Sequence, residues 1–249
     1  MPGRRATRIQ AIVLGRTKLR EQDLILTMLA KGGEQVRAVA KGARKPGSRL
    51  AARTEVCCEI DLLMTQGRGL GIVSEAQIVD AHEGVRPDLD SLSCASALCE
   101  LARVTSYEDV ADPFLYAILS RALCACEEAR DRSHLELAYA AYAIKVLSHS
   151  GWRPVLDCCV ACGESSASRF SVRAGGVLCE SCMREVEGAL AVTDNQVAWL
   201  KALVGSTFSA LMDAEIDAAT SGFLVRVAHG WASTHLDARL RAAEFFIGV

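Results

Sequence analysis

Two Cys-x-x-Cys pairs constrain this chain more than any other feature of its sequence. The first pair is Cys159 and Cys162, and the second, Cys179 and Cys182, follows after 16 intervening residues. Two such knuckles supply four thiolates, which complete a tetrahedron around zinc with each sulfur about 2.3 Å from the metal. The spacer lies within the range of roughly 15–20 residues typical of zinc ribbons. The spacing predicts one structural zinc ion in a small insert at about residues 155–187.

The residues around the knuckles refine this prediction. The segment from Phe170 to Leu178 predicts a short hairpin that turns at residues 174–176. Cys158 precedes the first knuckle and has no second sulfur at knuckle spacing, so we expect it to pack beside the metal. Four protein sulfurs leave no coordination position for a water molecule. The expected zinc therefore stabilises the fold and performs no chemistry.

A catalytic zinc is an alternative that the sequence leaves open. The segment His134-Leu135-Glu136 matches H-x-E and precedes the first knuckle, an order that zinc-dependent nucleobase deaminases share. Against this, the residue before Cys159 is not proline, and the second knuckle would have no role. Ser133 and Glu136 also match a helix capping box, and we expect a histidine at such a helix start to be solvated.

Five short, partly alternating apolar runs between Thr7 and about Val79 predict β-strands. They span residues 9–14, 24–29, 36–40, 56–63 and 70–79, and glycine-rich or charged turns separate them. Five strands in a segment of this length fit a small barrel, and the OB-fold is the five-stranded barrel that binds oligonucleotides. We predict an OB-fold domain over residues 1–80.

After Pro87 the apolar periodicity becomes helical. Helices are expected at residues 91–105, from Asp112-Pro113 to about 130, and from the Ser133 capping box to Gly151. A second capping box, Thr193-x-x-Gln196, opens a helix that ends at Gly205, and a last helical stretch runs from about 214 to 240 with a weak point at Gly230. The fold class is therefore α+β, with a helical bundle over residues 81–249 that contains the insert.

The balance of charge differs between the two predicted domains. Residues 1–80 carry 14 Lys and Arg against 8 Asp and Glu, whereas the whole chain has a net charge of −2. Four of these cations stand in the Gly- and Pro-containing segment 41–49, which predicts a loop that can approach a phosphate backbone. No Phe, Tyr or Trp occurs in residues 1–80. Binding to nucleic acid should therefore be electrostatic and salt-sensitive, without base stacking.

Composition excludes several other classes. Hydrophobic residues make up 51% of the chain, enough for a core, and no apolar run reaches the roughly 18 residues that indicate a membrane span. Eleven cysteines, several within apolar helical patterns, fit a reducing compartment better than a disulfide framework, so we expect a cytoplasmic protein. Phosphate-loop and nucleophile-elbow motifs are absent. His82, His149, His229 and His235 show no metal-ligand spacing.

Several segments together resemble the RecO family of bacterial recombination mediators. The resemblance covers nearly the whole chain, and its most specific part is AKGARK with the downstream cysteine knuckles. It rests on AIVL at 11–14, Glu21-x-Asp23-Leu24-Ile25, AKGARKPGSR at 40–49, GWRPVLDC at 151–158, CVACG at 159–163, GGVLCESC at 175–182 and HLDARLRAAEFF at 235–246. The family often has an aromatic residue near position 19, where this chain has Leu19.

The resemblance implies a non-enzymatic DNA-binding mediator. Members combine an OB-fold, a helical bundle and a zinc-binding insert, bind single- and double-stranded DNA, and anneal complementary strands. They work with RecR, contact the C-terminal tail of single-stranded DNA-binding protein and help to load RecA. Carried over to this chain, the zinc ligands are Cys159, Cys162, Cys179 and Cys182. The DNA face is formed by Lys41, Arg44, Lys45 and Arg49, with Lys18, Arg20 and Arg37 as additions.

Three hypotheses therefore remain: a DNA-binding and annealing mediator, a zinc-dependent deaminase, and a protein-interaction scaffold whose basic loop is only solvated. The mediator predicts salt-dependent DNA binding, and the scaffold predicts none at physiological salt. The deaminase predicts that Glu136→Gln abolishes activity.

Overall fold

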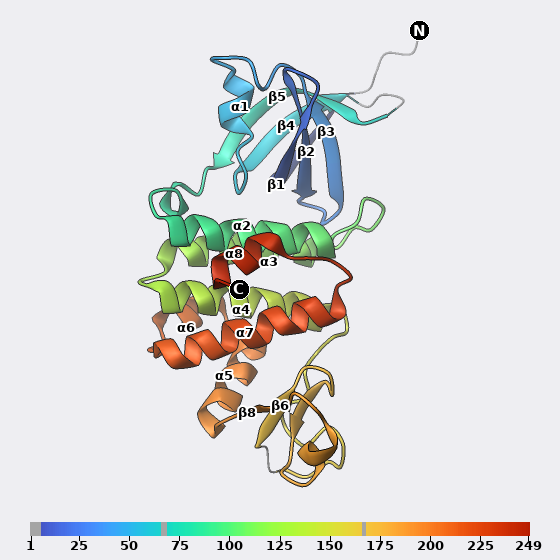
Figure 1. The fold of residues 1–249 in the computed structure, drawn as a ribbon. Coiled ribbons are helices and arrows are strands. Elements are labelled where there is room, and N and C mark those ends of the chain that lie inside the picture. The colour runs from blue at the N-terminus through green and yellow to red at the C-terminus, as the bar shows by residue number, and fades with distance from the viewer. Residues whose placement is uncertain (1–5, 66–68, 166–167) are drawn as a thin grey trace. The chain divides into compact units, whose positions relative to one another are not determined.

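The structure is a computed structural model that describes residues 6–65, 69–165 and 168–249 (Figure 1). The chain divides into two compact units, residues 1–127 and 128–249. No helix in the described ranges is long and apolar enough to cross a membrane.

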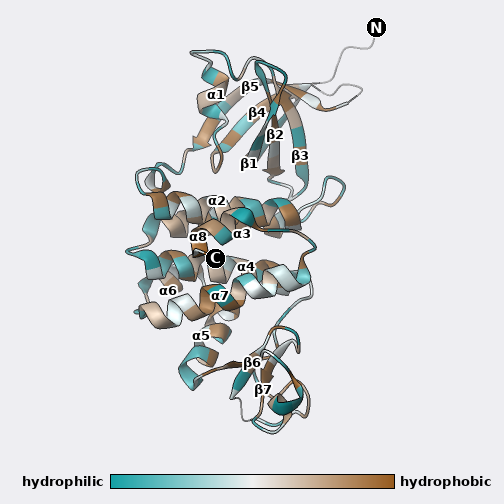
Figure 2. Ribbon diagram, viewed as in Figure 1, coloured by the Kyte–Doolittle hydropathy of each residue, from teal (hydrophilic) through white to brown (hydrophobic). Residues whose placement is uncertain are grey.

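The first unit begins with a closed five-stranded barrel, consistent with the predicted OB-fold. Its strands are β1 (Ala6–Leu19), β2 (Asp23–Ala30), β3 (Gln35–Ala40), β4 (Glu59–Thr65) and β5 (Gly71–Asp80). They follow the order β1-β2-β3-β5-β4, and only the short β3–β5 pairing is parallel. Leu24, Leu26 and Met28 of β2 are buried in the barrel core, while the residues between them are half-exposed. Figure 2 shows hydrophobic and hydrophilic residues along the same barrel strands.

The barrel differs from the sequence-based prediction in two places. Strand β4 begins at Glu59, later than the predicted residue 56, because Cys57 adopts a left-handed backbone (φ 71°) that interrupts an extended strand. A short helix, α1 (Arg49–Arg53), stands where the basic segment was expected to be a loop throughout. The Ser48 side chain caps this helix by accepting a hydrogen bond from the Ala51 N–H.

Helical structure in the first unit follows the barrel. The 3₁₀ turn η1 (Glu83–Val85) leads to α2 (Leu89–Thr105), which packs against β1 and β2. Helix α3 (Pro113–Glu128) begins with Pro113, as predicted, because proline suits the first turn, where no N–H is needed.

In the second unit, α4 (Arg132–His149) packs against three other helices. These are α5 (Asp194–Gly205), α6 (Phe208–Asp213) and α7 (Ala218–His235), and a short α8 (Arg241–Ile247) contacts α7. The predicted capping box at the start of α5 is confirmed, with Thr193 and Gln196 bonded reciprocally. The predicted last helical stretch, about 214–240, is the shorter helix α7, which continues through Gly230 without a break, and α8 follows beyond its predicted end.

The predicted capping box at the start of α4 is wrong. Asp131 is the N-cap, and its carboxylate accepts a hydrogen bond from the His134 N–H (3.0 Å). Glu136 instead accepts a hydrogen bond from the Ser221 hydroxyl of α7 (2.7 Å). His134 is also not solvated: it is 3% exposed, and its ring contacts the Asp131 carboxylate and the Ala214 carbonyl. The cap is thus two residues earlier than predicted, and the tertiary contact of Glu136 with Ser221 is one that local sequence does not show.

A small three-stranded sheet lies between α4 and α5 in the sequence. Its strands are β6 (Arg169–Ser171), β7 (Gly176–Leu178) and β8 (Leu190–Ala191), in the order β7-β6-β8, with the 3₁₀ turn η2 (Cys182–Glu185) between β7 and β8. The predicted hairpin over 170–178 is confirmed, and β8 is an additional strand. Gly176 is required here because a side chain would collide with the Val155 backbone.

Candidate metal centre and nucleic-acid interface

The first Cys-x-x-Cys knuckle forms a tight turn. The Cys159 carbonyl accepts a hydrogen bond from the Gly163 N–H (2.8 Å), and the Cys159 N–H donates to the Glu164 carbonyl (2.7 Å). Gly163 has φ +81°, a conformation that glycine adopts without a steric penalty. The turn brings Cys159 and Cys162 onto the same side of the loop.

The second knuckle follows strand β7. Cys179 comes directly after Leu178, the last residue of that strand, and its carbonyl accepts a hydrogen bond from the Met183 N–H (3.1 Å). Cys182 begins η2. A strand end therefore positions one sulfur and a helical turn positions the other.

The two knuckles bring four sulfurs together. Their Sγ atoms all lie within 4.8 Å of one another, and Sγ of Cys162 is 3.7 Å from Sγ of Cys179. A tetrahedron with zinc–sulfur distances of 2.3 Å places sulfurs about 3.8 Å apart. The residues therefore fit one zinc ion. Cys158, which the sequence placed beside the site, is not one of the four.

The sulfurs differ in how readily they ionise. Backbone N–H groups of Cys179, Cys162 and Ala161 donate to the Cys159 sulfur and lower the pKa of that thiol to about 6. Hydrogen bonds from its thiol to Cys162 and Cys179 raise the pKa of Cys182 to about 12. A metal binds the deprotonated sulfurs, so the lowered pKa of Cys159 favours metal binding and the raised pKa of Cys182 opposes it.

The geometry gives no support to a catalytic zinc. The group of potential metal ligands in the insert contains four cysteines and neither His134 nor Glu136. Glu136 contacts Ser221 and Arg132, and His134 contacts Asp131 and Ala214. Four sulfurs at tetrahedral separation leave no position for an activated water.

Basic residues gather around one turn and one loop of the barrel. The loop between β3 and α1 is bound to the turn between β1 and β2, because Arg44 N–H donates to the Gln22 carbonyl (2.9 Å) and Gly42 N–H donates to Asp23 Oδ1 (2.7 Å). This contact brings the turn and the loop side by side. We define the basic face by its members, Lys18, Arg20, Arg37, Lys41, Lys45 and Arg49, all of them exposed.

The basic face differs from other cations of the barrel in its pairing. Arg8 is paired with Asp61 and Arg16 with Glu55, each at 2.8 Å. In the described ranges, no carboxylate lies within 4.0 Å of a basic-face cation. Several positive charges without carboxylate partners favour the binding of an anionic ligand.

Arg44, also predicted on the DNA face, has a different position. Its Nη1 donates to the carbonyl oxygens of Glu21 (2.8 Å) and Arg20 (3.3 Å). The guanidinium thus holds the loop against the turn, a role that no local sequence pattern indicates.

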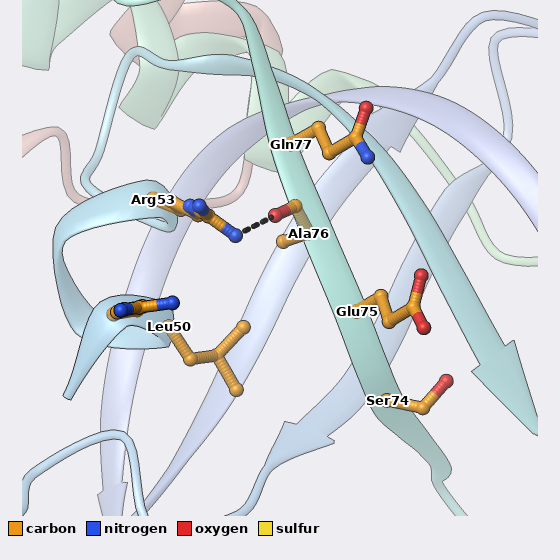
Figure 3. Close-up of a pocket in the computed structure, with 7 residues that line it drawn as sticks. Leu50, Arg53, Ser74, Glu75, Ala76 and Gln77 are labelled. Carbon is orange, nitrogen blue, oxygen red and sulfur yellow. Dashed lines mark hydrogen bonds between the residues drawn. The ribbon is translucent and has the colours of Figure 1, made fainter.

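A pocket of about 230 Å³ lies between α1 and β5 (Figure 3). Leu50 and Arg53 reach from α1 toward β5, and Nη1 of Arg53 donates to the Ala76 carbonyl (3.1 Å). Ser74 stands at a bulge, because Val73 pairs with Met64 and Glu75 with Leu63. Arg49, a member of the basic face, lines the same pocket as Arg53. The sequence-based prediction did not include Arg53.

A second group of potential metal ligands was also missed. His82, Cys124 and Glu127 each offer one donor atom, and these atoms lie within 4.8 Å of one another. The residues come from two distant segments, so no motif spacing links His82 to the other two.

Comparison with known proteins identifies the family. The family model described as "Recombination protein O N terminal" matches residues 5–82, and "Recombination protein O C terminal" matches residues 86–244. A DNA repair protein RecO of Bifidobacterium longum (strain DJO10A) is 36% identical over 177 residues, covering 70% of this chain and 73% of that protein. The RecO of Symbiobacterium thermophilum is 31% identical over 252 positions, covering 95% of both chains. The RecO of Desulforudis audaxviator is 29% identical, covering 95% of this chain and 94% of that protein. With its barrel, its helical region and these matches, the chain belongs to the RecO family of DNA repair proteins.

Proposed function

We propose that this chain is a non-enzymatic recombination mediator that binds single- and double-stranded DNA through the basic face of its barrel. The observation that carries the proposal is the set of six exposed cations without carboxylate partners. Lys and Arg side chains that neutralise phosphates release counterions, and this release drives binding that is independent of sequence. The RecO family's place in DNA repair supports the same ligand.

Strand annealing follows from the same charge distribution. Two complementary strands repel each other, and a surface that neutralises phosphates on both reduces this repulsion. Base pairing then supplies the free energy, so no hydrolysis is needed. The barrel segment contains no aromatic side chain that would hold bases in a stacked, unpaired state. The bases are therefore left available to pair.

The zinc and the protein partners complete the proposal. One structural zinc ion binds Cys159, Cys162, Cys179 and Cys182 and stabilises the insert. With RecR, the protein assists RecA loading in the cytoplasm, on single strands coated by single-stranded DNA-binding protein, whose C-terminal tail it contacts. These partners come from the family relationship. The acidic residues 81–249 are better suited to protein partners than to DNA.

An annealing assay tests this function. Two complementary oligonucleotides, one labelled with a fluorophore and one with a quencher, are mixed with the protein without any nucleotide cofactor. We expect quenching to be faster than without protein, and a Lys41→Ala, Lys45→Ala, Arg49→Ala variant to lose most of the acceleration. An Arg8→Ala variant, which removes an ion-paired cation from the same barrel, is the matched control and should retain it. Equal rates with and without protein would overturn the proposal.

A further inference from the structure

The group His82, Cys124 and Glu127 stands apart from the insert and from the basic face. His82 lies between β5 and η1, and the other two residues are three positions apart on α3, on one face of that helix. All three belong to the first unit. We propose that this group is a second transition-metal site, with zinc as its ion.

The donor atoms lie near the positions that zinc requires. His82 Nδ1 is 2.9 Å from Glu127 Oε2, and both lie within 4.8 Å of the Cys124 sulfur. A tetrahedral ion bound by nitrogen, oxygen and sulfur keeps these donors about 3.3–3.5 Å apart. Asp80 Oδ1 lies 3.8 Å from His82 Nδ1 but is not one of the three grouped donors.

The histidine and the carboxylate are held in place by further contacts. The backbone N–H of His82 donates to Asp80 Oδ1 (2.8 Å), and Glu127 Oε1 accepts a hydrogen bond from the backbone N–H of Gly84 (2.9 Å). Outer contacts of this kind orient metal ligands in proteins. The His82 side chain is 1% exposed, and its Nε2 has no hydrogen-bond partner among the described residues, so Nδ1 alone fixes the ring against Glu127.

The backbone at His82 is left-handed, which is uncommon for a residue other than glycine. Its φ of 44° and ψ of 55° bring Cβ of a non-glycine residue close to the following carbonyl oxygen. Strain of this kind persists where surrounding contacts hold it, and it concentrates at functional sites. Here it turns the imidazole toward α3.

The donor set selects the ion. Imidazole and thiolate favour zinc and other late transition metals over magnesium or calcium, which prefer oxygen ligands. A metal here joins the end of the last barrel strand to α3, and so stabilises the first unit at that junction. The alternative is that His82 and Glu127 form only a hydrogen bond or ion pair, without a metal.

Zinc stoichiometry of the full chain separates the alternatives. Protein stripped with a chelator is reloaded with zinc and desalted, and bound metal is measured by mass spectrometry. We expect two zinc ions per wild-type chain and one in a Cys162→Ser, Cys182→Ser variant, whose insert keeps only two sulfurs. Adding Cys124→Ala to that variant should remove the last ion. Adding Cys126→Ala instead should leave that ion bound. Cys126 lies on α3 like Cys124, but its sulfur contacts that of Cys94.

Two further measurements distinguish the loss of a metal ligand from misfolding of the variant. His82→Asn also removes a ligand, and asparagine tolerates the left-handed backbone; it should remove the ion while the circular dichroism spectrum is retained. Zinc should raise the unfolding temperature of the insert variant, but not after Cys124→Ala. A zinc-free insert variant, or an ion that survives both Cys124→Ala and His82→Asn, would overturn the second site. DNA binding is expected in all these variants, so failure here is distinguishable from failure of the proposed function.

Discussion

The sulfurs of Cys162 and Cys179 lie 3.7 Å apart, although one belongs to a loop turn and the other follows strand β7. The separation is that of two ligands on one tetrahedral zinc. The knuckles are joined through the small sheet, so a metal that binds both also fixes the strands between them. The insert has few other buried apolar residues around these sulfurs. Its stability should therefore depend on the metal.

Replacing one cysteine of the cluster tests this dependence. Cys162→Ser should abolish zinc binding to the insert, because three sulfurs and a hydroxyl bind zinc poorly. The insert should then become sensitive to limited proteolysis, while DNA affinity of the barrel changes less than about threefold. Cys158→Ser is the matched control, since Cys158 lies outside the cluster. Loss of insert zinc in the control, or its retention in Cys162→Ser, would contradict the assignment.

The Glu136 side chain should contribute to stability and not to catalysis. Glu136→Gln weakens a contact with Arg132 within α4 and a contact with Ser221 that joins α4 to α7. A hydrogen bond to a charged group contributes about 1.5–3 kcal/mol, and glutamine keeps part of it, so we expect a loss of about 1 kcal/mol in the free energy of unfolding. Urea denaturation measures this loss.

The same variant tests the deaminase hypothesis. DNA annealing and zinc content should be unchanged in Glu136→Gln, and neither wild type nor variant should release ammonia from cytidine or adenosine oligonucleotides. Glu128→Gln, at the exposed end of α3, provides a neutral surface comparison. Wild-type deamination that Glu136→Gln abolishes would restore the catalytic alternative.

His235 should make the second unit less stable in mild acid. Its ring stacks on Trp152, with centroids 4.3 Å apart, and contacts the edge of Trp231; burial there lowers the pKa of His235. The neutral ring is favoured in the folded state, so this contribution is full above about pH 6.5, the unfolded pKa. It is lost as the pH falls from 6.5 through the lower folded pKa, because the unfolded chain binds the proton more readily.

A pH series of urea denaturation checks this direction. The fall in stability between pH 7 and pH 5.5 should be smaller in His235→Phe, which keeps a stacking ring but does not titrate. An unchanged or steeper fall in the variant would show that other groups control the acid response.

The sequence was most informative where periodicity or spacing carries physical meaning. Short, partly alternating apolar runs such as residues 24–29 predicted barrel strands because a period of two matches the pleat. The cysteine spacing predicted the grouping of four sulfurs because a knuckle is a local structure. The capping box at Thr193 was found for the same reason.

Features that depend on distant contacts were missed. Helix α1 has five residues, too few for a helical period. Glu136, which the capping box placed at the helix start, instead contacts Ser221 of α7, 85 residues away. Arg44 binds carbonyls of a turn more than 20 residues away, and His82 meets Glu127 across 45 residues. None of these pairings leaves a periodic signal in the sequence.

The salt dependence of DNA binding tests the central claim most directly. Fluorescence anisotropy with a labelled single-stranded oligonucleotide gives log K against log salt concentration, with a slope of about −0.7 per neutralised phosphate. We expect a steep slope for the wild type and a slope about 2 units shallower for Lys41→Ala, Lys45→Ala, Arg49→Ala. Arg44 is left intact because it holds the loop, and Arg8→Ala should keep the wild-type slope. No binding at low salt, or the same slope in the triple variant, would contradict a DNA interface on the basic face.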